Sequence, residues 1–163
     1  MPTRLVLDKI EIEKMDGILQ DLIKASHAKC AVVIEQEGRC LLKKGFSINL
    51  DVDAMAALLA GSFSSNKALA DLMGERDFTV LFHQGEKDNI HTHLIDESRI
   101  LSVIFDDQTI IETVRAHSKA AADQLVILLK EAANRATDAD KQLESESETF
   151  QKLEDIFEKT DEM

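Results

Sequence analysis

The sequence predicts an α/β (α+β) domain with three helices and five strands in the order α-β-β-α-β-β-β-α, followed by an acidic tail. Apolar residues recur at helical spacing in three long segments, and short runs rich in β-branched residues lie between them. The composition turns polar and acidic after residue 135. We therefore expect a folded domain at residues 1–135, an acidic disordered linker at 136–149 and a short amphipathic motif at 150–163.

The first helix is expected from about residue 8, because the apolar residues between Ile10 and Ile23 mostly follow the helical period. The segments "KCAVVIEQ" and "RCLLKKG" follow it and are predicted to be two strands of a hairpin that turns near Glu37 and Gly38. The chain thus begins with a helix and a hairpin.

Cys30 and Cys40 lie on the two strands of this hairpin. A two-residue turn would set Cys30 opposite Gly45, leaving the sulfurs roughly 16 Å apart along the strands. An intrachain disulfide cannot span that distance, so we expect two buried, reduced thiols.

The second half of the domain should contain a helix, three strands and a final helix. The helix is expected to begin after Asp51 or Asp53 as N-cap and to end at about Glu75. The segments "DFTVLFHQ", "NIHTHLID" and "RILSVIFDD" are predicted to be strands. The third helix should extend from Thr109 to about Arg135.

Strand character predicts where two strands lie and whether three histidines meet. Residues 31–34 and 100–105 are almost continuously apolar, as expected for central strands covered on both faces. His91 and His93 alternate with apolar residues, so we expect them on a partly exposed face. His83 joins them only if its loop has an odd number of residues; an even number places it on the opposite face.

Composition excludes several classes of partner. The formal net charge is −12 and Phe is the only aromatic residue type, which argues against nucleic acid and anionic membranes. No apolar run approaches ~18 residues, and the N-terminal segment lacks a hydrophobic signal core. We expect a cytoplasmic protein without a cofactor, a resident metal or an inserted membrane segment.

Five short segments in this order resemble the Roadblock/dynein light chain domain family, and within it the MglB-like branch. They are "AK" at 28–29, "LLAGSF" at 58–63, "LADLMGE" at 69–75, "FHQGEKD" at 82–88 and "VIFDDQT" at 103–109. The resemblance covers about residues 5–133. It implies a Roadblock-type fold, with a five-stranded, mainly antiparallel sheet and helices on both faces.

The resemblance also implies a homodimer that binds a small Ras-like GTPase of the MglA type in its GTP-bound form. The second helix supports this independently, because small residues recur along it at helical spacing and a glycine inside a helix suggests close backbone approach. Packing of this helix on its own sheet is the alternative. The candidate contact residues, with two from the expected edge strand, are Ala57, Gly61, Ser64, Ser65, Ala68, Val80 and Phe82.

The sequence contains no nucleophile elbow and no phosphate-binding loop, so the chain should not hydrolyse GTP itself. The resemblance implies a GTPase-activating protein in bacterial cell polarity or motility that repositions the GTPase's own residues. One alternative is a scaffold of the same fold that binds a GTPase or motor complex without changing turnover. A third possibility is a metal or small-ligand sensor that uses His83, His91 and His93.

The last segment carries an apolar stripe within an acidic background. Residues 136–163 contain ten Asp or Glu and three Lys, while Phe150, Leu153, Ile156 and Phe157 share one helical face. Such a face suits docking into an apolar groove, and the resemblance implies a contact with the GTPase. A solvated acidic tail is the alternative.

Overall fold

A computed structural model describes residues 5–45 and 49–161. Residues 1–4 of the expected domain and residues 162–163 of the expected tail motif lie outside the described residues, as do residues 46–48. The chain divides into two compact units, Asp8–Leu128 and the combination of Met1–Leu7 with Leu129–Met163. The first unit contains the sheet, and the second contains most of the C-terminal helix.

The first helix, α1 (Lys9–Ser26), begins where the sequence predicts. Asp8 caps it, because its side chain accepts a hydrogen bond from the Glu11 backbone N–H while the Glu11 carboxylate accepts one from the Asp8 backbone N–H. Met15 and Leu19 are fully buried on its inner face. The helix ends at His27, which adopts the left-handed conformation with φ 58°.

The predicted hairpin is formed by β1 (Cys30–Glu35) and β2 (Cys40–Gly45). Cys30 pairs with Gly45 as expected, but the register shifts near the turn, where Ile34 pairs with Cys40 and Leu41 is the extra residue of a bulge. Both cysteines are free thiols; Cys30 is buried and Cys40 is partly buried.

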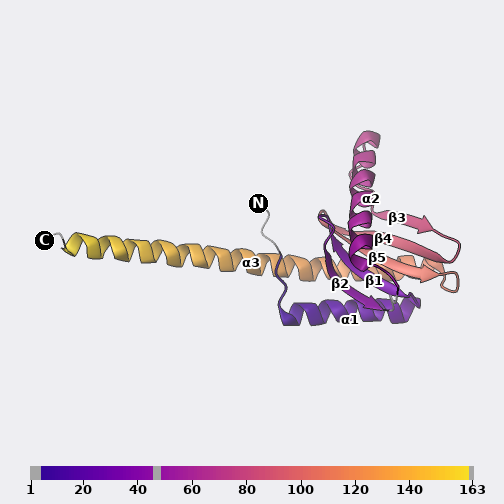
Figure 1. The fold of residues 1–163 in the computed structure, drawn as a ribbon, viewed down its shortest axis with the longest axis horizontal. Coiled ribbons are helices and arrows are strands. Elements are labelled where there is room, and N and C mark those ends of the chain that lie inside the picture. The colour runs from indigo at the N-terminus through magenta and orange to yellow at the C-terminus, as the bar shows by residue number, and fades with distance from the viewer. Residues whose placement is uncertain (1–4, 46–48, 162–163) are drawn as a thin grey trace. The chain divides into compact units, whose positions relative to one another are not determined.

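A second helix follows the hairpin, and three further strands then complete the sheet (Figure 1). These elements are α2 (Val52–Met73), β3 (Val80–Gln84), β4 (Asp88–Asp96) and β5 (Arg99–Asp106). The strand order is β2-β1-β5-β4-β3, and every adjacent pair is antiparallel. The prediction that residues 31–34 and 100–105 form central strands is confirmed, since β1 and β5 lie side by side in the middle.

Helices cover both faces of this sheet. On one face, α2 packs on Val32, Ile34 and Ile100 through buried residues that include Ala56 and Leu59. On the other face, α1 lies near β2, where Lys44 donates a hydrogen bond of 3.0 Å to the Asp16 carboxylate. Arg115 from the first turns of the third helix lies close enough to His91 to affect its pKa, which places that helix on the same side as α1.

The third helix is much longer than the sequence predicts. It extends as α3 (Ile111–Asp161) over 51 residues and includes segment 136–149, for which a disordered linker was expected. That expectation rested on the acidic composition, but the segment contains neither Gly nor Pro, and eight of its 14 residues are Ala, Leu, Glu, Gln or Lys, which propagate a helix well. In the described parts of the chain, no helix is both long and apolar enough to cross a membrane.

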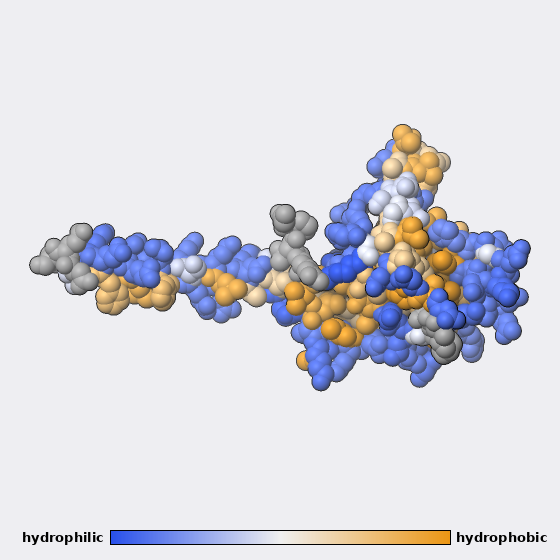
Figure 2. Space-filling model, viewed as in Figure 1, coloured by the Kyte–Doolittle hydropathy of each residue, from blue (hydrophilic) through white to orange (hydrophobic). Residues whose placement is uncertain are grey.

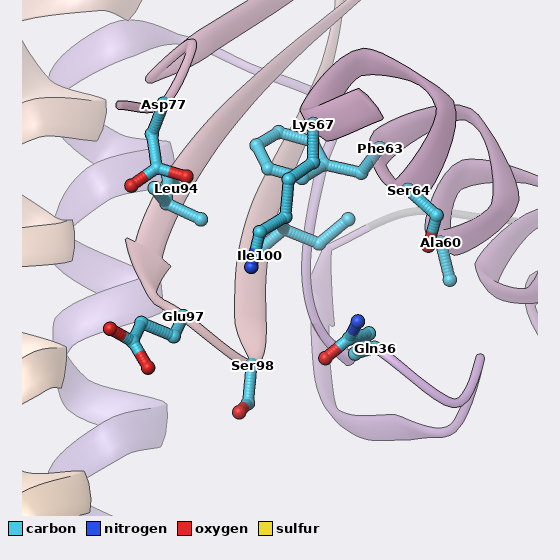
Figure 3. Close-up of a pocket in the computed structure, with 10 residues that line it drawn as sticks. All are labelled: Gln36, Ala60, Phe63, Ser64, Lys67, Asp77, Leu94, Glu97, Ser98 and Ile100. Atoms are coloured by element: carbon cyan, nitrogen blue, oxygen red, sulfur yellow. The ribbon is translucent and has the colours of Figure 1, made fainter. Parts of the chain in front are cut away.

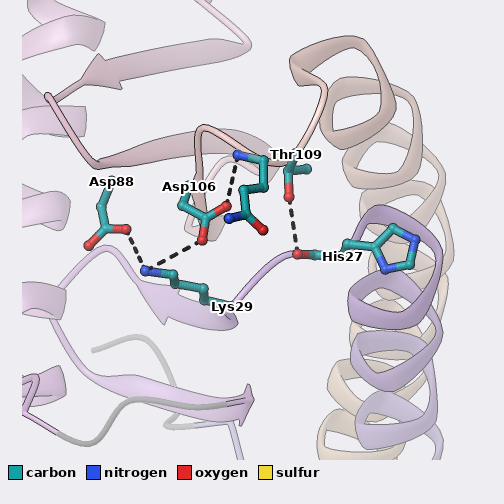
Figure 4. Close-up of polar contacts among 6 residues, drawn as sticks. His27, Lys29, Asp88, Asp106 and Thr109 are labelled. Atoms are coloured by element: carbon teal, nitrogen blue, oxygen red, sulfur yellow. Dashed lines mark hydrogen bonds and ion pairs between the residues drawn. The ribbon is translucent and has the colours of Figure 1, made fainter.

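Three of the five family-like segments meet at one corner of the sheet (Figure 4). Lys29 Nζ lies 2.7 Å from Asp88 Oδ1 and 3.7 Å from Asp106 Oδ2, so it joins the start of β4 and the end of β5 to the residue that precedes β1. Thr109 Oγ1 donates a hydrogen bond to the His27 carbonyl oxygen. The hydrogen bond with Asp88 raises the pKa of Lys29. These motif residues therefore link neighbouring strand termini to one another.

Candidate functional site

The small residues of α2 face away from the sheet. Ala57, Gly61, Ser64, Ser65 and Ala68 are all exposed, and a Cβ built on Gly61 would meet no atom within 4 Å. Packing of Gly61 on its own sheet, the alternative left open by the sequence, therefore does not explain this glycine.

Ala57, one of these small residues, lies against another segment of the same chain. A Cβ built on Gly38, in the β1–β2 turn, would lie 3.1 Å from the Ala57 Cα. Gly38 has φ 91°, so the turn itself needs the left-handed conformation. Close approach of this turn explains the small residue at 57, whereas Gly61 and Ala68 face outward.

The outer face of α2 also carries large apolar side chains. Leu58, Leu69 and Leu72 are 73%, 50% and 85% exposed, and helical periodicity places them beside Gly61 and Ala68. Figure 2 shows pale and orange surface along α2, with orange at its C-terminal end.

The charged residues of α2 lie elsewhere on the helix. Asp53, Lys67 and Asp71 fall together on a different side, so the outer face is free of charge. We define the α2 outer face as Leu58, Gly61, Ser65, Ala68, Leu69 and Leu72. Sequence reasoning identified its small members but missed the leucines, although their spacing of three and four residues from the small ones was the available signal.

A pocket opens on a different side of α2 from the outer face, between the helix and the two turns at one end of the sheet (Figure 3). Its cavity volume is about 30 Å³, room for a small group, and the space that includes the open solvent at its entrance is about 400 Å³. Phe63, Leu94 and Ile100 form its apolar part, while the Lys67 side chain lies across it in Figure 3. Charged side chains, among them Asp77 and Glu97, also line the pocket, so it offers a partner side chain both apolar contact and charge. Of the predicted contact residues, Ser64 lines it.

The two predicted residues of the edge strand differ in their surroundings. Among the described residues β3 is the last strand of the sheet and pairs only with β4, so its outer backbone edge can accept another strand. Val80 is 39% exposed. Phe82 is half-buried because its ring stacks on Phe105, with centroids 6.2 Å apart. The Val80 side chain is therefore more accessible to a partner than the Phe82 ring.

The three histidines do not form one cluster. His83 pairs with Ile90, and residues opposite each other share a face, so His83 lies on the face away from His91 and His93. His91 is fully buried, which corrects the expected partly exposed face; β4 is an interior strand, and its His91 side is covered near Arg115. Among the described residues, no group of three or more His, Cys, Asp or Glu could hold a metal ion.

The environment of His91 keeps its ring uncharged. Burial lowers the pKa of His91 to about 4, with smaller contributions in the same direction from the nearby His93 and Arg115. Neither ring nitrogen finds a hydrogen-bond partner among the described residues. In contrast, His93 Nδ1 donates a hydrogen bond of 2.9 Å to the Leu94 carbonyl oxygen. His91 is therefore a neutral core residue.

The sequence and fold of this chain are similar to those of known proteins. The family described as Roadblock/LC7 domain matches residues 14–105. A solved structure of MglB from Myxococcus xanthus is 30% identical with a TM-score of 0.70, and the match covers 72% of this chain and 96% of that one. The gliding protein MglB from Thermus thermophilus is 28% identical with a TM-score of 0.75, and that match covers 80% and 99% of the two chains.

A third solved structure, "MglB with tetrameric arrangement", is 28% identical with a TM-score of 0.76, and the match covers 81% of this chain and 99% of that one. No curated protein matches the sequence. The matched family covers more than half of the chain, and the sheet order and helices agree with the Roadblock-type fold expected from the sequence. The chain belongs to the Roadblock/LC7 domain family, and solved MglB proteins are among its relatives.

Proposed function

We propose that this protein is a homodimeric regulator of a small Ras-like GTPase of the MglA type, and that it activates GTP hydrolysis by that partner. The observation that carries the proposal is the charge-free, exposed α2 outer face on a chain similar to MglB proteins. Bacterial cell polarity or motility, in the cytoplasm, is the setting that this similarity suggests.

The α2 outer face supports the homodimer. Covering an exposed leucine completely contributes roughly 1.5–3 kcal/mol, and Leu58, Leu69 and Leu72 lie on this one face. Gly61 and Ala68 between them allow a second helix to approach closely. A two-fold pair of α2 helices would remove these side chains from water and leave the adjoining surface for the GTPase.

The pocket beside α2 supports a role in which this protein positions residues of the GTPase without taking part in the reaction. This pocket is lined by Phe63, Leu94 and Ile100 and by charged side chains that include Lys67 and Asp77. Such a pocket can hold one side chain of a GTPase loop, and fixing a loop in the geometry needed for hydrolysis can accelerate the GTPase's own reaction. The catalytic residues would then all come from the GTPase.

A matched pair of glycine variants tests the proposal. Gly61 and Gly17 both lie exposed in helices, and an added Cβ at either position meets nothing within 4 Å. Gly61→Leu should obstruct close approach to α2 and lower stimulation of GTP turnover by on the order of tenfold or more. Gly17→Leu, on α1, should leave stimulation unchanged.

The assay measures single-turnover GTP hydrolysis by an MglA-type GTPase from the same genome, with and without the full chain. Stimulation by the wild type that is lost in Gly61→Leu supports the proposal. Tight binding of the GTP-bound partner with unchanged turnover would instead identify the non-catalytic scaffold. Absence of binding to any Ras-like GTPase would reject both functions.

A further inference from the structure

The C-terminal part of α3 carries an apolar seam with a seven-residue period. Ala136, Leu143, Phe150 and Phe157 are spaced seven residues apart, and Ala139 and Leu153 occupy the positions three residues after the first and third of them. These are the a and d positions of a coiled coil. We define the α3 seam as these six residues together with Glu146, which occupies the intervening d position.

The seam is covered in one part of the helix and uncovered in the other. Ala122 and Leu125 hold the same a and d positions earlier in α3 and are buried. Leu143, Phe150, Leu153 and Phe157 are 63%, 65%, 50% and 70% exposed. Figure 2 shows separate orange patches along one edge of the C-terminal part of α3 and mostly blue surface along the opposite edge.

We propose that this α3 seam pairs with the same seam of a second copy of this chain as a two-stranded coiled coil. The period favours a helical partner, because an α-helix keeps a strict seven-residue stripe in contact only with another supercoiled helix. The stripe from Ala136 to Phe157 is about 32 Å long at ~1.5 Å per residue, so it needs a partner that is extended over the same length. The second copy supplies one.

The size of the seam is sufficient for such a pair. Two copies would cover four Phe and four Leu side chains, on the order of 1,000 Å² in total, which is the lower range of a specific interface. An exposed helix without packing is only marginally stable in water, so pairing also accounts for a continuous helix over an acidic segment. Ala136 and Ala139 at the start of the seam allow the two backbones to approach.

The acidic charge of the tail distinguishes pairing between two copies from docking on a GTPase. Docking on a GTPase is what the apolar stripe of Phe150, Leu153, Ile156 and Phe157 suggested from sequence. Residues 136–163 carry ten acidic and three basic residues, so two tails repel each other. Added salt screens this repulsion and should increase pairing between copies. Docking of an acidic helix on a basic groove of another protein would weaken with salt.

Glu146 provides a gain-of-function test with a matched control. It lies in the seam, whereas Glu148 lies two residues further on and on the opposite side of the helix. Glu146→Leu should strengthen pairing severalfold because it removes a charge from the apolar contact. Glu148→Leu introduces the same side chain outside the seam and should leave pairing unchanged. Phe150→Ser should abolish pairing while preserving the fold of the domain.

The experiment uses full-length chains prepared in light and heavy isotope forms, mixed until they exchange, and treated with a lysine cross-linker. Lys141, Lys152 and Lys159 are the tail lysines that report pairing. Light–heavy links among them that increase with salt and in Glu146→Leu, but not in Glu148→Leu, support the coiled coil. Absence of such links in both the wild type and Glu146→Leu would overturn it and return the seam to a GTPase or to solvent.

Discussion

Acidification should destabilise the fold through His91, and the expected size of the effect follows from its burial. The pKa of His91 is lowered from 6.5 to about 4 in the folded chain, chiefly because the ring is buried. As pH falls below 6.5, the unfolded chain binds a proton that the folded chain does not bind until the pH approaches about 4. Stability attributable to His91 is therefore present above the unfolded pKa and is lost across this window.

The magnitude can be worked from these two pKa values. At about pH 5, most of the unfolded chains but few of the folded ones carry the proton, which lowers the free energy of unfolding by about 2 kcal/mol relative to neutral pH. His91→Leu removes the titrating group and also the two ring nitrogens that lack partners. It should be at least as stable as the wild type at neutral pH, because an unpaired buried polar group is destabilising.

Urea unfolding followed by circular dichroism, at fixed protein concentration and at several pH values, measures the effect. Other acid-sensitive groups are common to both chains, so the difference between wild type and His91→Leu isolates His91. His83→Leu makes the same exchange at an exposed position and serves as the matched control. If the free energies of unfolding of the wild type and of His91→Leu fall by the same amount down to about pH 5, burial of His91 does not lower its pKa as described.

Three further outcomes are expected. Light scattering at micromolar concentration should give a mass well above the 18.2 kDa of one chain, and a single-chain mass would contradict the role of the α2 outer face. Gly45→Ala should lower the free energy of unfolding by several kcal/mol, because Gly45 has φ 101° and an added Cβ would collide with the Lys29 carbonyl oxygen. Gly61→Ala should instead raise the free energy of unfolding by ~0.5–1 kcal/mol, since an added Cβ there meets no atom and Ala favours the helix. Equal changes for the two variants in thermal unfolding would contradict this difference between the sites. Ser102→Ala should lower the free energy of unfolding by ~1–3 kcal/mol, because it leaves the buried Thr92 hydroxyl, 2.9 Å from the Ser102 hydroxyl, without its partner. In urea unfolding, the double variant with Thr92→Val should recover part of that lost stability.

Most of the fold could be predicted because its signals are local. Asp8 and Asp51 mark the starts of two helices, and the near-continuous apolar runs in β1 and β5 indicate central strands. Their positions depend on neighbours within a few residues, which a sequence displays directly. The bulge at Leu41 was not predicted, since a two-residue turn accounts equally well for the pairing of Cys30 with Gly45.

The features that were missed depend on which elements pack together. Alternation placed His91 on one face of β4 but could not show that this face is covered near Arg115. Phe82 was expected to need a surface of another chain, because its partner within the chain, Phe105, is distant in sequence. For segment 136–149, acidic composition and helix propensity gave opposite signals, and propensity corresponds to the structure. The small residues of α2 were visible in sequence, whereas the exposed α2 leucines required the structure to show which side faces outward.

The bulge in β2 gives the chain two native chemical reporters. By adding Leu41 between Cys40 and the rest of the strand, it turns Cys40 toward the same face as Cys30, so both residues pack in the core cluster beneath α2. Burial raises the pKa of both thiols, which keeps them unreactive while the helix is in place. Cys40 lies near Asp53 at the start of α2. The ratio of the alkylation rates of Cys40 and Cys30, compared between the free chain and the chain bound to a partner, would therefore show whether binding loosens the start of α2 or the whole helix.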